Sequence, residues 1–203
     1  MRCATKVIGP MAVLVLLASA SCSSGTSATT PAASAQTVSR PAPTRVAIAA
    51  STALNCRHHI AAHPPGADQR VVLGVVALSA STRAVALQIA RDNTQPATVR
   101  YFAKDGLIVR AGTAFELVVP TEAAEQLAIR WGGEALTWTR KLTVSCPKDV
   151  SSSGWLVYVG GYWLPRPACV PLLVRADGKE QRVLIGAGKP CPGQRPPVEP
   201  SDS

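Results

Sequence analysis

Apolar and polar residues alternate with a period of two along much of the chain between residues 54 and 193. The segment 136–146 is the longest example, with Leu, Trp, Arg, Leu, Val and Cys at one set of alternate positions and Thr, Lys or Ser at the other. Segments 85–89, 115–119 and 127–131 follow the same rule. Successive side chains of a strand point to opposite faces of a sheet, so this pattern is typical of half-buried antiparallel strands. The chain is therefore predicted to be all-β.

Turn residues support this prediction. Asp105-Gly106 and Asp177-Gly178 each lie between two apolar runs, and Asp-Gly favours a tight hairpin because it tolerates positive φ. The run 71–78 is apolar on both faces and is expected to form a central strand, while Thr121 is expected to cap a short helix over 121–126. About nine or ten short strands predict an antiparallel β-sandwich of immunoglobulin-like type, with a small antiparallel barrel as the alternative.

The N-terminus has the form of a signal peptide. Arg2 and Lys6 precede an apolar run over 7–18, which is shorter than the roughly 20 residues of a membrane-spanning helix. Two cleavage routes are open. Ala18-Ser19-Ala20 fits an ordinary signal peptidase, whereas Ser19-Ala20-Ser21-Cys22 resembles the lipobox of bacterial lipoproteins, with Ser19 where Leu is usual.

The cysteine count favours the second route. The chain has six Cys, and Cys3 is removed with the leader. Ordinary cleavage would leave an odd thiol in an oxidising compartment, whereas lipidation of Cys22 leaves four Cys for two disulfides. We therefore expect a lipid anchor on Cys22 at the outer face of the cell membrane, with a secreted form as the alternative.

The expected organisation follows from composition. Residues 1–21 form the signal peptide. Residues 22–53, rich in Ser, Thr, Ala and Pro, form a disordered linker because they have few large apolar groups to bury. Residues 54–193 form one β-sandwich domain, and 194–203 form a disordered tail.

The four remaining Cys allow three pairings. Cys169 and Cys191 flank the hairpin expected at Asp177-Gly178, so they should meet at its open end. Cys56 and Cys146 then pair by elimination. We therefore expect the disulfides Cys56–Cys146 and Cys169–Cys191.

One stretch is rich in aromatic residues. Trp155, Tyr158, Tyr162 and Trp163 surround Gly160-Gly161, and Arg166 follows. Two interpretations compete: the aromatic rings fill the core, or Tyr158, Tyr162, Trp163 and Arg166 form a surface that stacks on a sugar or a protein partner.

The three His of the chain, His58, His59 and His63, lie close to Cys56. They are weak candidates for metal ligands, because Cys56 is expected in a disulfide and Pro64-Pro65-Gly66 favours a loop. We expect no metal and no other cofactor.

Charge and motifs exclude several function classes. The net charge is +9, and removal of Arg2 and Lys6 with the leader lowers it by two, but the basic residues are scattered and form no nucleic-acid-binding motif. No G-x-S-x-G elbow or phosphate-binding loop is present. We therefore do not expect nucleic-acid binding or catalysis. A metal-dependent hydrolase at the three His is the least favoured alternative.

Six further segments of the region 56–193 are informative when taken together: 102–112, 115–120, 160–163, 168–172, 185–188 and 191–193. Through them, residues 56–193 resemble a group of lipoproteins and secreted proteins of high-GC actinobacteria. The resemblance implies the fold and the compartment but carries over no catalytic residue.

These features lead us to expect a cell-envelope lipoprotein whose β-sandwich binds a protein partner or a cell-wall glycan. The alternative is a structural or accessory envelope protein without a small ligand.

The anchor can be tested at the mature N-terminus. We expect mass spectrometry of the protein purified from membranes to find a chain that begins at Cys22 and carries acyl groups. An unmodified chain that begins at Ser21 would contradict the lipoprotein interpretation.

Overall fold

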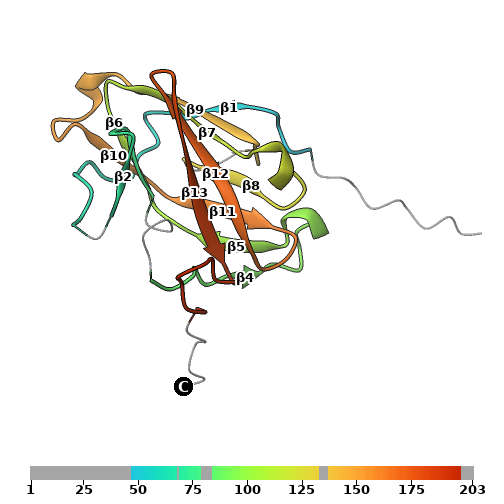
Figure 1. Cartoon of the computed structure of the whole chain (residues 1–203). Helices are drawn as coiled ribbons and strands as arrows, with labels where there is room; N and C mark the ends of the chain where they lie inside the picture. Colours follow the sequence, from blue (N-terminus) through green and yellow to red (C-terminus); the bar gives the residue numbers. More distant parts are fainter. Residues whose placement is uncertain (1–46, 68, 79–83, 133–136, 198–203) are drawn as a thin grey trace, which may run out of the picture. The chain divides into compact units, whose positions relative to one another are not determined.

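The computed structural model describes residues 47–67, 69–78, 84–132 and 137–197, and the regular secondary structure of these residues consists almost entirely of strands (Figure 1). Cys22 and the leader lie outside the described residues. The strands are β1 (Thr52–Ala53), β2 (Val71–Val72), β3 (Val76–Leu78), β4 (Ala90–Arg91), β5 (Tyr101–Lys104), β6 (Leu107–Arg110), β7 (Ala114–Val118), β8 (Ala128–Trp131), β9 (Lys141–Ser145), β10 (Trp155–Tyr158), β11 (Gly160–Leu164), β12 (Ala168–Ala176) and β13 (Lys179–Ala187). The described helices are short 3-10 helices, η2 (Ala97–Val99), η3 (Thr121–Ala123) and η4 (Lys148–Val150).

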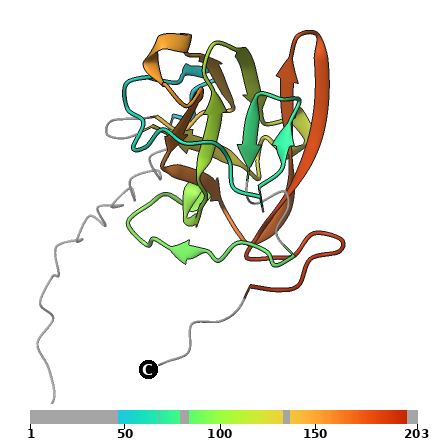
Figure 2. The ribbon, with the colours of Figure 1, turned by 90° about the vertical axis from the view of Figure 1, so that its left-hand side faces the viewer.

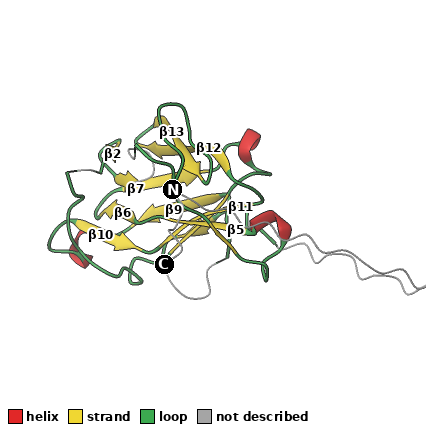
Figure 3. Ribbon diagram, turned by 90° about the horizontal axis from the view of Figure 1, so that it is seen from below, coloured by secondary structure: helices red, strands yellow, loops and turns green. Residues whose placement is uncertain are grey.

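The strands form three sheets, in the orders β1-β9-β7-β12-β13, β10-β6-β3-β2 and β4-β5-β11-β8. All the strand pairs are antiparallel except β1 with β9. The prediction of an all-β, sandwich-like fold is confirmed, and Figure 3 shows the helical turns at the periphery of the strands. The distribution over three sheets differs from the two sheets of an immunoglobulin domain.

The two four-stranded sheets share one bent ribbon of two long strands. Strand β5 pairs with β11, and β6 pairs with β10. The register is unbroken through the bend, because Lys104 lies opposite Gly161 and Leu107 lies opposite Tyr158. The ribbon therefore passes from one sheet into the other at Asp105-Gly106.

The predicted hairpin at Asp105-Gly106 is thus wrong. The chain bends there but does not reverse, and β5 and β6 belong to different sheets. Asp105 is 4% exposed, and its N–H donates to the carbonyl oxygen of Gly160 across the ribbon (3.0 Å). Its own carbonyl oxygen accepts a hydrogen bond from Nε1 of Trp131 (3.0 Å). These partners hold the residue inside the fold, whereas a hairpin tip would be exposed.

Gly160 and Gly161 permit the close packing at the bend. Their φ values are 157° and 155°, in a region that is almost restricted to glycine. A Cβ at Gly161 would overlap the carbonyl oxygen of Ala103, and one at Gly160 would overlap that of Arg130. The neighbouring strands can approach β11 only because neither residue has a side chain.

The hairpin predicted at Asp177-Gly178 is confirmed. Ala176 lies opposite Lys179, and both turn residues have positive φ, 49° and 71°, as a tight two-residue turn requires. Figure 2 shows this long hairpin edge-on along one side of the domain.

Two other local predictions are wrong. The segment 71–78 is itself a hairpin, in which Val72 lies opposite Val76, because Leu73 and Gly74 adopt positive φ. Residues 121–126 begin with the 3-10 helix η3, whose N-cap is Pro120 and which has no side-chain capping bond.

Both predicted disulfides are present. Cys56–Cys146 joins the start of the domain to the end of β9, and Cys169–Cys191 closes the open end of the β12–β13 hairpin. They close loops over sequence separations of 90 and 22 residues. Such bridges typically stabilise a domain by about 2–4 kcal/mol each, mainly by restricting the unfolded chain.

The folded part extends beyond the predicted limits of 54 and 193. The N–H of Ala49 donates to the carbonyl oxygen of Trp138 (2.8 Å), and β1 continues this pairing along β9. At the other end, Arg195 exchanges backbone hydrogen bonds with Ala84 and Ala86. The boundaries of the linker at 53 and of the tail at 194 are therefore corrected by a few residues.

The bend predicts a large difference between two glycine substitutions. Gly161→Ala should lower the free energy of unfolding by about 2 kcal/mol or more, because its Cβ would overlap backbone that cannot move freely. Gly106→Ala is the control, since a Cβ there meets nothing within 4 Å, and it should change stability by less than about 1 kcal/mol. Urea unfolding of both variants measures the effect, and equal losses would refute this account of the bend.

Candidate functional site

The aromatic stretch is part of the core. Tyr158 and Tyr162 are 0% exposed and Trp163 is 7% exposed, while Arg166 is exposed in the turn between β11 and β12. The predicted contact surface at Tyr158, Tyr162 and Trp163 is therefore wrong. The other interpretation, core packing, accounts for these residues, because Tyr158 and Tyr162 belong to the main buried cluster and Trp163 belongs to a second, smaller one.

Tyr162 faces the interior at the bend. Its hydroxyl donates to Oδ2 of Asp105 (3.1 Å), and its ring meets Trp131 edge to face at 5.3 Å. Burial, with the nearby charge of Asp105, raises the pKa of Tyr162 well above its ordinary value. The phenol therefore stays protonated and holds the carboxylate inside the fold.

Trp163 lies on the opposite face of the same strand. It stacks on Phe102 with ring centroids 4.4 Å apart and meets the edge of Trp138 at 5.6 Å. The guanidinium of Arg130 lies 4.7 Å from the Trp163 ring centre, and burial lowers its pKa from the ordinary value. This small cluster contributes packing and cation–π stabilisation rather than an open platform for stacking.

The three His do not form a metal site. Nδ1 of His58 donates to the carbonyl oxygen of Gly132 (3.1 Å), that of His59 to Cys56 (3.0 Å) and that of His63 to Pro64 (2.8 Å). Cys56 is in a disulfide, so it offers no thiolate. In the described part of the chain, no group of three or more His, Cys, Asp or Glu is placed to hold a metal ion.

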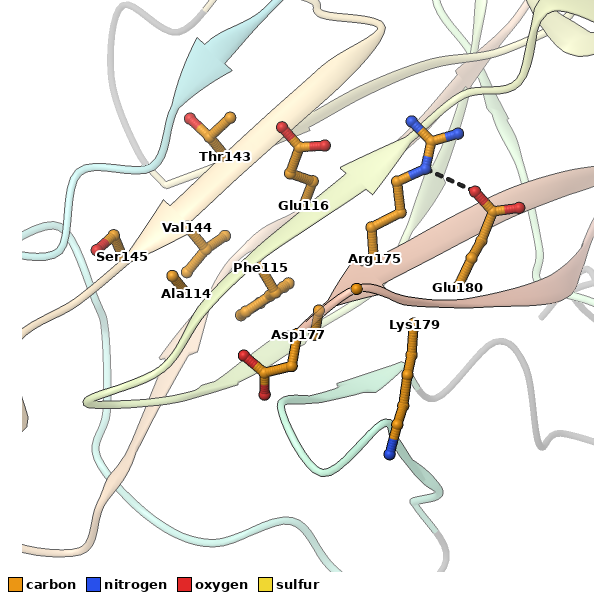
Figure 4. Close-up of a pocket in the computed structure, with 12 residues that line it drawn as sticks. Ala114, Phe115, Glu116, Thr143, Val144, Ser145, Arg175, Asp177, Lys179 and Glu180 are labelled. Atoms are coloured by element: carbon orange, nitrogen blue, oxygen red, sulfur yellow. Dashed lines mark hydrogen bonds and ion pairs between the residues drawn. The ribbon is translucent and has the colours of Figure 1, made fainter.

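A hollow lies beside the tip of the β12–β13 hairpin, where β7 and β9 approach it (Figure 4). It is open and has a volume of about 670 Å³. Buried Phe115 and Val144 are among its lining residues, and Thr143 and Ser145 add hydroxyl groups. The charged residues that line it are Glu116, Arg175, Asp177, Lys179 and Glu180.

A second hollow of about 470 Å³ lies over β7, β12, β13 and η3. It shares Arg175 and Glu180 with the first and adds Glu122 and Arg182. We call the two hollows together the sheet groove. The Arg175–Glu180 ion pair, with Nε and Oε2 2.6 Å apart, lies between them.

Ion pairs order the charges of the sheet groove. Arg182 pairs with Glu122 at 2.8 Å, and Lys141 of β9 pairs with Glu116 at 3.0 Å. A hydrogen bond from its own backbone N–H, followed by the bond from Arg182, lowers the pKa of Glu122. The groove therefore carries charges of both signs on a chain whose net charge is +9.

Sequence reasoning missed the sheet groove. Alternation places Glu116 on the polar face of its strand. Arg175, which lies opposite Glu116, and Glu180, which lies opposite Arg175, come from strands about 60 residues later in the chain. No motif links them. Only the register of β7, β12 and β13 brings the three together.

The chain matches no protein-family model and no curated protein in the comparisons made. Among the described residues, no helix has the length and apolar character needed to cross a membrane.

Burial of Tyr158 predicts how stability depends on pH. Burial raises the pKa of Tyr158 to about 12, so the unfolded chain releases this proton at lower pH than the folded one. The free energy of unfolding should fall as the pH rises from about 10 to about 12, by of the order of 1 kcal/mol per pH unit. Tyr158→Phe should make this fall shallower in rapid denaturant titrations, and an unchanged slope would refute the assignment.

Proposed function

We propose that the protein is a cell-envelope lipoprotein, anchored through Cys22 to the outer face of the membrane. The leader and the cysteine context support the anchor. The two disulfides of the β domain support an oxidising compartment, because such bridges persist outside the cytoplasm.

We further propose that the β domain binds a protein partner or a cell-wall component through the sheet groove. The observation that carries this proposal is the pair of adjoining hollows, which share one exposed ion pair; the lining of the first hollow is largely apolar and that of the second is more polar. Ligand sites in proteins combine a concave apolar surface with a few polar groups that orient the ligand. The groove replaces the aromatic stretch as the proposed contact surface.

Position-dependent photocrosslinking in the native envelope tests this function. A photoreactive residue at Ser145, which lines the first hollow, should give a covalent adduct with a protein or with wall material. The same residue at Thr98, which is exposed on η2, serves as the control and should give none. Protease and muramidase digestion then separate a protein adduct from a wall adduct, and equal yields at both positions would reject the groove as the contact surface.

A further inference from the structure

The charges of the sheet groove form a transverse row. Glu116, Arg175 and Glu180 lie directly opposite one another on β7, β12 and β13. In Figure 4 the side chains of Glu116 and Arg175 extend on the same side of the sheet, and the dashed line joins Arg175 to Glu180. The signs alternate across the row, so cationic and anionic groups of the protein are within reach of one small ligand.

These groups are able to exchange partners. The side chains of Arg175 and Glu180 are each 47% exposed, and ion pairs with such exposure contribute only about 0–1 kcal/mol. A ligand carboxylate can therefore replace Glu180 beside Arg175, and a ligand ammonium can replace Arg175 beside Glu180, at little cost. Neither protein charge is left unpaired in the complex.

The same features disfavour other ligands. An anionic polymer would meet the carboxylates of Glu116, Asp177 and Glu180 in the first hollow. A neutral glycan is usually held by stacking on exposed aromatic rings, but the one aromatic residue that lines either hollow, Phe115, is 4% exposed.

We infer that the ligand of the sheet groove is an extended peptide segment with one cationic and one anionic side chain on the same face. This inference rests on the proposed binding function and gives it a ligand class. In an extended chain, residues two positions apart lie on one face about 7 Å from each other. Such a spacing places a carboxylate near Arg175 and an ammonium near Glu180, on the face of the sheet that also carries Glu116 and Thr143.

Calorimetric titration of the intact protein tests the inference. The probe is a capped pentapeptide with Lys at position two, Glu at position four and Thr elsewhere. It should bind about threefold more tightly than the two forms in which either charged residue is replaced by Gln. Arg175→Gln should weaken binding of the probe by a similar factor but leave binding of the form without Glu unchanged. Glu180→Gln should likewise weaken binding of the probe but leave binding of the form without Lys unchanged.

The matched control is Arg70→Gln, at an exposed position outside both hollows, which should leave binding of the probe unchanged. Three results would overturn the inference: equal affinity for the three peptides, no measurable binding of any of them, or a loss of probe binding with Arg70→Gln as large as that with Arg175→Gln. Binding of chitopentaose that Arg175→Gln abolishes would also overturn it in favour of a glycan. In those cases a photocrosslinked adduct that forms at position 145 but not at position 98 would still support the proposed binding function. Absence of that adduct would reject both the proposed function and the peptide inference.

Discussion

The close approach of three strands at Gly160-Gly161 is the constraint on which the rest of the fold depends. The carbonyl oxygens of Ala103 and Arg130 occupy the space where side chains would stand. This approach lets one ribbon of two long strands turn from one four-stranded sheet into the other without losing register. It also brings Tyr162 and Trp131 to Asp105, whose carboxylate accepts a hydrogen bond from the Tyr162 hydroxyl and whose backbone carbonyl oxygen accepts one from Nε1 of Trp131. These buried polar groups are therefore paired, as burial requires.

The disulfides act at the two ends of this arrangement. Cys56–Cys146 lies beside Tyr158 of β10, whose hydroxyl donates to the carbonyl oxygen of Cys56 (3.2 Å). The part of the ribbon formed by β6 and β10 is therefore tied to the start of the domain. Cys169–Cys191 fixes the base of the β12–β13 hairpin. The base is then held covalently, while the tip of the hairpin borders the sheet groove. A rigid frame with a polar face at its edge suits recognition by preformed geometry.

The two Asp-Gly pairs illustrate what local sequence can and cannot predict. Period-two alternation identifies the strands, and Asp177-Gly178 forms the expected hairpin because its turn is exposed. Asp105-Gly106 has the same local signal, but Tyr162, 57 residues away, holds Asp105 inside the fold. The cysteine pairing was predictable because it followed from the correct hairpin. The sheet groove was not, since its charges meet only through the register of distant strands.

Burial of the aromatic residues also narrows the contacts that the proposed binding face offers to a partner. Tyr158, Tyr162 and Trp163 stabilise the core and the bend, so their rings are not available for stacking on a ligand. The sheet groove instead offers charges whose internal pairing is weak and exposed. Specificity at such a face comes from matching the sequence of signs, because a ligand of uniform charge leaves like charges opposed. The net charge of the chain is +9, so the protein as a whole attracts polyanions. The alternating charges of the sheet groove instead favour a peptide segment that carries both signs.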